Sequence, residues 1–236
     1  MQKISAIPSR DALPLATPRA WRIALATALL GVVLFGAISS DALFTDASRL
    51  AQLDAFCAAW APRHLGPAWV PLMRSVSVVH GTAGTLALSA LLGILLYRRS
   101  EWWWWRDLVL TVPGGMLLNV WLKEIFQRTR PAGADPLTLP DSFSFPSGHA
   151  TYACLFYGFL LVWLFNRSPP LRAPARYLAA VAAVLACVMV GASRVGLRVH
   201  FASDVIAGAV EACAWIAICL MLTGFLAHRA HHGTNG

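Results

Sequence analysis

Charged side chains are scarce in this chain of 236 residues: they make up 13% of it, whereas soluble domains have about 25%. Apolar residues make up 58%, and the mean hydropathy is +0.61. The shortage of charge excludes a disordered chain and an ordinary soluble domain. Long uncharged runs instead favour one integral membrane domain over residues 1–236.

Paired cysteines and a basic tail are also missing. The five cysteines form no C-x-x-C pair and most lie in apolar runs, so we expect neither a disulfide framework nor a zinc site. Basic residues outnumber acidic ones by 19 to 11, but they fall in small groups between apolar runs. This distribution argues against a nucleic-acid partner and favours anionic lipid or an anionic substrate.

Six runs are long and apolar enough to cross a hydrocarbon core of about 30 Å, or nearly so. They cover residues 23–40, 75–97, 103–122, 150–166, 177–191 and 205–227. We therefore predict an all-α fold, a polytopic membrane bundle of six transmembrane helices. A cleaved signal peptide is the alternative for the first run, although the tail before it is long.

The distribution of Lys and Arg predicts the orientation of this bundle. Eleven of the 19 basic residues fall on the side that carries both termini. By the positive-inside rule, the tails 1–22 and 228–236 face the cytoplasm and the loops after the first, third and fifth spans face outward. We expect a multi-pass protein of the inner (cytoplasmic) membrane, with a periplasmic or exterior active site.

Three polar stretches occur near the outward ends of the spans. They read Lys123-x6-Arg130-Pro131, then Pro146-Ser147-Gly148-His149, then Ser193-Arg194-x5-His200-x3-Asp204. One loop joins the first stretch to the second, and two spans separate the second from the third. All three therefore meet at one membrane surface.

The cations in these stretches suit a phosphate ester. Lys123, Arg130 and Arg194 can neutralise the phosphate oxygens, and the backbone N–H groups of Ser147 and Gly148 at a helix start can assist them. Taken singly, each cation is more often a membrane anchor, and a Pro-Ser-Gly turn is more often a helix cap. The functional hypothesis rests on their conjunction.

Two histidines can supply the remaining chemistry. We assign nucleophilic attack on phosphorus to His200 and protonation of the leaving alkoxide to His149. Asp204, four residues after His200, can fix the ring tautomer if the sixth helix begins by His200. This arrangement needs no metal and no cofactor, so we expect activity in the presence of chelator.

The three stretches resemble the signature of the type 2 phosphatidic acid phosphatase superfamily, and all eleven specified residues are met in order between positions 123 and 204. The resemblance implies a helical bundle with its site just outside the membrane core. It also implies roles for eight residues: phosphate binding by Lys123, Arg130 and Arg194 with Ser147 and Gly148, acid catalysis by His149, and nucleophilic attack by His200 with Asp204 as its partner.

The expected function is therefore a lipid phosphatase that acts on a phosphomonoester or pyrophosphate through a phosphohistidine. The family implies undecaprenyl pyrophosphate, phosphatidylglycerol phosphate, phosphatidic acid or lipid A phosphate as substrates. A phosphotransferase with the same phosphohistidine is the first alternative. A haloperoxidase and a non-catalytic lipid-binding or transport protein are more remote. The expected partners are the lipid substrate and membrane lipids, while the oligomeric state stays open.

Four ionisable residues are left outside this predicted site. His80 and Glu211 fall within spans, where an ionisable group calls for a partner that the sequence does not identify. Arg128 and Arg198 occupy unspecified motif positions, and we expect surface roles for both.

Overall fold

The computed structural model describes residues 15, 17–44, 48–135, 137, 141–166 and 171–233. Within these residues all regular structure is helical, which confirms the all-α prediction. The helices are α1 (Pro18–Phe44), α2 (Arg49–His64), η2 (Pro67–Trp69), α3 (Val70–Val79), α4 (Thr82–Arg98), α5 (Trp102–Phe126), α6 (Gly148–Asn166), α7 (Ala173–Gly196) and α8 (Ala202–Gly233).

Five of these helices, α1, α5, α6, α7 and α8, are long and apolar enough to cross a membrane. A sixth span is obtained only if the bent pair formed by Pro67–Val79 and Thr82–Arg98 is taken as one. Apolar side chains point outward from the bundle: Ile23, Leu29 and Val33 of α1 are 58%, 60% and 66% exposed. Such a surface suits lipid rather than water.

The predicted continuous span 75–97 is wrong, because the helix breaks at its sixth residue. Helix α3 ends at Val79, α4 begins at Thr82, and the two segments are bent by 52°. Gly84 permits the bend, since a Cβ there would lie 2.1 Å from the Val79 carbonyl oxygen. His80 therefore lies at the end of α3 rather than inside a transmembrane helix.

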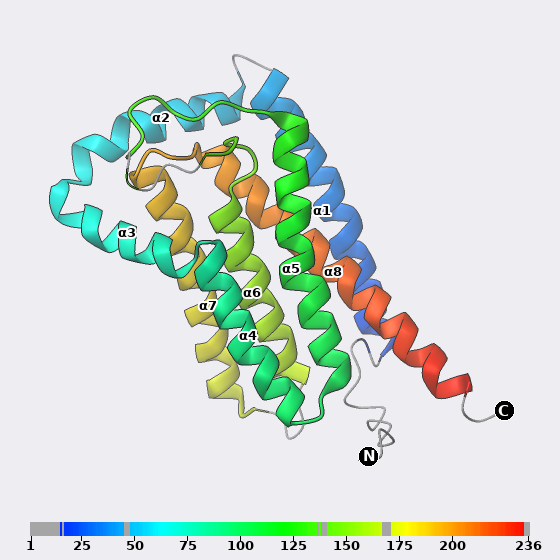
Figure 1. The fold of residues 1–236 in the computed structure, drawn as a ribbon. Coiled ribbons are helices and arrows are strands. Elements are labelled where there is room, and N and C mark those ends of the chain that lie inside the picture. The colour runs from blue at the N-terminus through cyan, green and yellow to red at the C-terminus, as the bar shows by residue number, and fades with distance from the viewer. Residues whose placement is uncertain are drawn as a thin grey trace.

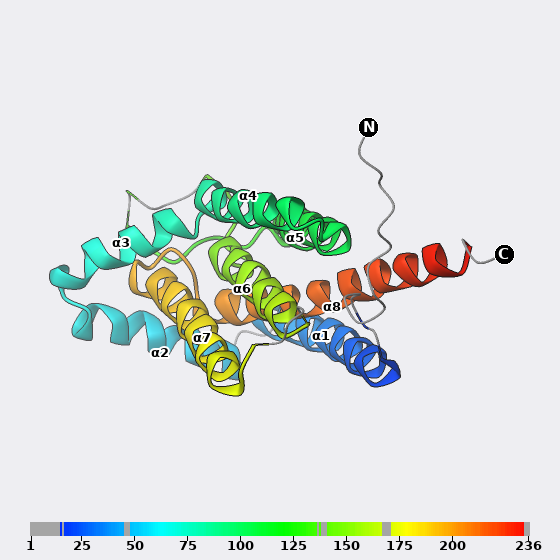
Figure 2. The ribbon, with the colours of Figure 1, turned by 90° about the horizontal axis from the view of Figure 1, so that it is seen from below.

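A helical hairpin made of α2, η2 and α3 was not anticipated. It lies across one end of the bundle and extends beyond its side (Figure 1, Figure 2). Ser48 begins α2 by accepting a hydrogen bond from the Ala51 N–H, as N-cap serines do. With 16 residues and several charges, α2 lacks the long apolar run that marks a span.

Helix α6 lies inside the bundle, in contact with α4, α5, α7 and α8 (Figure 2). Small residues allow these helices to approach closely. A Cβ at Gly115 of α5 would come within 2.6 Å of Leu155 and 2.8 Å of Trp215. A Cβ at Gly31 of α1 would lie 2.7 Å from that of Ala214. Such close contacts are typical of helices packed in a membrane.

Four helix ends meet near the hairpin, and they carry the three motif stretches. Helices α5 and α7 end there at Phe126 and Gly196, while α6 and α8 begin there at Gly148 and Ala202. Helix α1 begins, and α8 ends, at the opposite end of the bundle (Figure 1).

Candidate active site

His200 lies in the turn between α7 and α8, and it is 3% exposed. Its Nε2 lies 3.1 Å from Nη1 of Arg130, and its Nδ1 lies 3.4 Å from Oδ2 of Asp204. Because the arginine can only donate, Nε2 must accept and Nδ1 carries the proton. The unshared electron pair of the ring therefore lies on the side of Arg130.

The His200 ring is held neutral by its surroundings. Burial lowers the pKa of His200 to about 3, because an imidazolium shielded from water is costly. The hydrogen bond and negative charge of Asp204 raise this pKa, while Lys123 and Arg130 lower it further. A neutral ring at physiological pH is the state that a nucleophile requires.

Asp204 is fully buried in the first turn of α8. Its Oδ2 accepts hydrogen bonds from the Ser144 hydroxyl (2.5 Å) and the Phe201 N–H (2.9 Å). The contact with Phe201 closes the start of α8 in the manner of a capping box. We expected His200 and Asp204 to share a helix face if the helix began by His200, but α8 begins only at Ala202. The two side chains nevertheless face each other across the start of this helix.

Arg130 follows the end of α5, where Gln127 adopts a left-handed conformation with φ 47°. Its guanidinium donates to the carbonyls of Ser142 (2.9 Å), Phe143 (3.1 Å) and Val199 (2.6 Å). Partial burial lowers the pKa of Arg130, because it shields part of the guanidinium from water. A phosphate group would supply the missing counter-charge.

Lys123 lies in the last turn of α5 and is 6% exposed. Its ammonium donates to the carbonyls of Phe143 (2.7 Å) and Pro146 (2.6 Å), and more weakly to that of Ser144 (3.4 Å). Lys123 thereby holds the loop that leads into α6. It lies where the sequence predicted it, but it also shapes the loop that carries the second motif.

Arg194 and His149 are both held by a residue that the sequence did not single out, Ser77 of α3. Nη1 of the fully buried Arg194 donates to the Ser77 hydroxyl at 2.6 Å. The ring of His149 bonds to the backbone of Ser77 and lies close enough to His200 and Arg194 for their charges to act on it. The two histidines therefore share one site.

Ser147 and Gly148 have different roles in the structure: Ser147 forms a hydrogen bond to α8, and Gly148 allows close packing of α6 against α5. The N–H of Ser147 donates to the Asp204 carbonyl at 3.0 Å, so this group is not directed at a phosphate as we expected. Ser147 directly precedes α6, and its N–H is already engaged by this carbonyl in the first turn of α8. The buried Ser147 hydroxyl has no partner among the described residues. Gly148 lets α6 approach α5, since a Cβ there would lie 3.2 Å from Asn119 Oδ1.

Arg128 is not the surface residue that the sequence predicted. Its Nη1 donates to Oδ1 of Asp204 (2.5 Å), and its Nη2 donates to Asp54 of α2 (3.0 Å). Asp54 in turn accepts from the N–H and the hydroxyl of Ser203. The charge of Arg128 was visible in the sequence, but no local pattern pointed to Asp54.

Glu211 and His80 have partners in the structure. Glu211 accepts hydrogen bonds from Nδ2 of Asn119 (2.9 Å) and the hydroxyl of Thr151 (3.0 Å). His80 contacts the Val76 carbonyl and, at 2.9 Å, the Tyr157 hydroxyl. Asn119 and Thr151 lie one helical turn from Lys123 and Ser147, so the Glu211 cluster forms a layer beneath the site.

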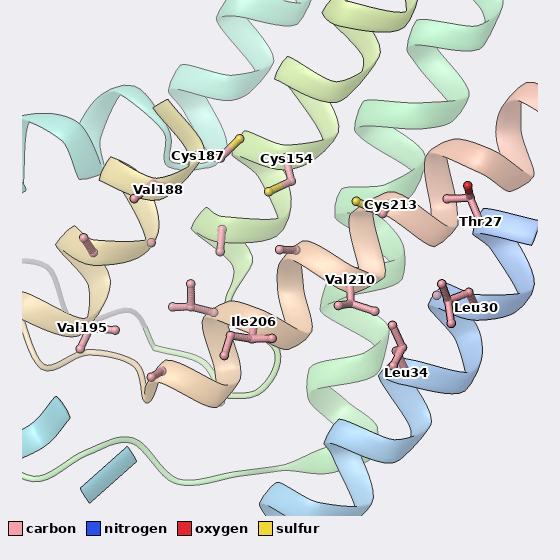
Figure 3. Close-up of a pocket in the computed structure, with 17 residues that line it drawn as sticks. Thr27, Leu30, Leu34, Cys154, Cys187, Val188, Val195, Ile206, Val210 and Cys213 are labelled. Atoms are coloured by element: carbon pink, nitrogen blue, oxygen red, sulfur yellow. The ribbon is translucent and has the colours of Figure 1, made fainter. Parts of the chain in front are cut away.

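An apolar groove opens beside the site between α1, α6, α7 and α8 (Figure 3). Its volume is about 660 Å³. Leu30, Leu34, Val210 and Ile206 line it together with the thiols of three cysteines, Cys154, Cys187 and Cys213 (Figure 3). Ala150, which follows His149, also lines it, so the groove reaches the end of α6 that carries His149.

Comparisons with known proteins agree with the helical membrane fold. A profile of the PAP2 superfamily matches residues 104–226, a range that contains every predicted site residue. Phosphatidylglycerophosphatase B of Bacillus subtilis (strain 168) is 34% identical over 181 residues, covering 76% of this chain and 86% of that protein. The crystal structure of a transmembrane PAP2-type phosphatidylglycerolphosphate phosphatase from Bacillus subtilis is also similar. Its TM-score is 0.70 at 26% identity, covering 88% of this chain and 96% of that one.

Proposed function

We propose, from the premise that this chain belongs to the PAP2 superfamily and is a membrane lipid phosphatase, that it hydrolyses phosphatidylglycerol phosphate through a phosphohistidine. The substrate is suggested by the names of the similar curated protein and of the similar solved structure, which both give a phosphatase of this lipid. The observation that carries the mechanism is the orientation of His200, with Nδ1 toward Asp204 and Nε2 beside Arg130.

In the first half-reaction, Nε2 of His200 attacks phosphorus and the bond to the lipid alkoxide breaks. His149 donates the proton that the alkoxide needs, and the lipid leaves as an alcohol. Arg130, Arg194 and Lys123 neutralise the phosphoryl oxygens as charge builds on them. Asp204 stabilises the positive charge that develops on the His200 ring.

In the second half-reaction, water attacks the phosphohistidine. His149, now unprotonated, takes a proton from this water, and inorganic phosphate leaves as the N–P bond breaks. His200 returns to its neutral state, which its burial favours. No metal takes part in either step, so chelator should leave the rate unchanged.

The lipid chains of the substrate would occupy the groove shown in Figure 3, which reaches the catalytic end of α6. A bilayer lipid can enter such a lipid-facing groove sideways while its headgroup reaches the histidines. The excess of Lys and Arg on the side of the termini favours a site at the outer face of the inner membrane, with both termini in the cytoplasm.

The test is a panel of lipid phosphates presented to the purified enzyme in detergent with chelator, scored by release of inorganic phosphate. We expect steady release that is fastest with phosphatidylglycerol phosphate and absent with the variant His200→Ala. A faster rate with phosphatidic acid or undecaprenyl pyrophosphate would change the substrate assignment. A single stoichiometric burst would instead indicate a phosphotransferase that awaits a lipid acceptor.

A further inference from the structure

Arg128 connects the hairpin helix α2 to the carboxylate beside His200. Its guanidinium lies between two buried carboxylates, those of Asp54 and Asp204, and is 4.2 Å from the centre of the Phe201 ring. Asp54 is 5% exposed and also accepts a 2.8 Å hydrogen bond from the Ser203 N–H in the first turn of α8. The guanidinium thus joins three segments: the end of α5, α2 and the start of α8.

The contacts of Arg128 differ in kind from those of Arg130, two residues later. In the described part of the chain, the hydrogen bonds of Arg130 go to uncharged groups, namely carbonyls, the Ser142 hydroxyl and His200. A phosphate dianion can displace such partners. Arg128 is already paired with two carboxylates, so a phosphate would have to separate two buried ion pairs to reach it.

The Asp204 carboxylate needs to be held at both oxygens. Oδ2 lies 3.4 Å from His200 Nδ1, which is long for a hydrogen bond in the resting state. As His200 becomes cationic during phosphoryl transfer, this distance must shorten without rotation of the carboxylate. Arg128, at 2.5 Å from Oδ1, fixes the other end of the carboxylate.

We propose that Arg128 is a positioning residue of the hydrolytic site, which holds Asp204 for His200, and that Asp54 of α2 holds Arg128 in turn. This inference rests on the proposed function of His200. It gives the hairpin a direct role: α2 sets the orientation of the catalytic carboxylate, 150 residues later in the sequence.

The experiment compares Arg128→Gln, Arg128→Lys, Asp54→Asn and the double variant Arg128→Gln/Asp54→Asn. Glu101→Gln is the matched control, because Glu101 forms an ion pair with Arg99 at the opposite end of the bundle. We measure kcat and KM for the preferred lipid phosphate after checking that each protein is monodisperse and folded in detergent.

Arg128→Gln should lower kcat by about 10- to 100-fold and change KM by less than about threefold. Asp54→Asn should lower kcat less, and the double variant should match Arg128→Gln because both changes act through one guanidinium. Arg128→Lys should recover part of kcat, since an ammonium group can pair with one carboxylate but not bridge two. Additive effects, or a loss confined to KM, would overturn the proposal.

A second readout is independent of turnover. Diethyl pyrocarbonate modifies neutral imidazoles, and mass spectrometry can follow its reaction with His200. A loosened Asp204 should make the buried ring react several-fold faster in Arg128→Gln and Asp54→Asn, but not in Glu101→Gln. An inactive wild type whose His200 responds in this way would refute the proposed function and retain the positioning role. If the wild type is active and all variants match it in both kcat and His200 reactivity, the proposed function stands and the positioning role of Arg128 is refuted. If Arg128→Gln does not fold, the same two measurements on Asp54→Asn and Arg128→Lys test the positioning role.

Discussion

Replacing Glu211 should separate the stability of the bundle from the geometry of its site. The Glu211 carboxyl accepts hydrogen bonds from Asn119 and Thr151, which lie in α5 and α6. Its other oxygen, Oε1, and the Asn119 Oδ1 are both buried, and neither has a partner among the described residues. In Glu211→Leu the Thr151 hydroxyl and one of the two Nδ2 hydrogens of Asn119 lose their acceptor, while the other Nδ2 hydrogen keeps its bond to Thr151. In Glu211→Gln the amide oxygen can accept both bonds and the NH₂ group can donate to Asn119.

The magnitude follows from the number of donors. Each buried donor left without a partner costs about 1–3 kcal/mol, so Glu211→Leu should lose about 2–6 kcal/mol. For a chain of this size that corresponds to a fall in melting temperature of about 4–24 °C. Glu211→Gln should cost less than about 1 kcal/mol, because its hydrogen bonds are kept.

Asp107→Leu provides the matched control, because Asp107 is a buried carboxylate that accepts a hydrogen bond from Thr223 further along α8. Both leucine variants should lower the melting temperature in detergent. Only Glu211→Leu should also lower kcat/KM at temperatures where both proteins are folded, because its partners lie one turn from Lys123 and Ser147. A Glu211→Gln variant as unstable as Glu211→Leu would refute the hydrogen-bond account.

Three further predictions concern the proposed catalytic residues. Because burial holds the pKa of His200 at about 3, well below the ordinary 6.5, the unfolded chain binds more protons between these values and stability falls as the pH drops from about 6.5 to about 3. In this pH range, His200→Asn should reduce the slope of the free energy of unfolding against pH by up to about 1.4 kcal/mol per pH unit. An unchanged slope would contradict the lowered pKa of His200. Arg194→Lys should lower kcat/KM by about a hundredfold, since an ammonium cannot replace the guanidinium fork; a near-normal rate would make Arg194 a structural anchor. His149→Ala should slow turnover by about 10²- to 10⁴-fold, with labelled phosphoenzyme accumulating in acid-quenched samples; normal turnover would exclude His149 as the acid.

The sequence predicted those features that depend on residues close together in the chain or on the length of a membrane span. Apolar runs predicted most of the helices, and the motif spacing indicated which helix ends carry Lys123 and Arg194. Both residues lie in the last turn of a helix, one span length from the preceding loop. These relations hold for any straight helix that crosses a bilayer, so they need no knowledge of packing.

The hairpin and its contacts could not be predicted in this way. Ser77 and Arg194 are 117 residues apart, and Asp54 and Ser203 are 149 residues apart. Such pairs are brought together by the fold, and a single sequence contains no local trace of them. The break at His80 was hidden for a related reason: the run 75–97 contains His80 but no Asp, Glu, Lys or Arg, and hydropathy does not record that Gly84 permits a sharp bend.

The four helix ends at the site explain why these charges stand where they do. Lys123 and Arg194 lie at the C-terminal ends of α5 and α7, where the helix dipole favours cations, and Asp204 lies in the first turn of α8, where it favours an anion. The start of α6 differs, since its first turn contains no acidic residue. In the proposed function, the substrate phosphate would supply the favourable negative charge at this end. It would complete a pattern of favourable charges that Lys123, Arg194 and Asp204 form at the other three helix ends.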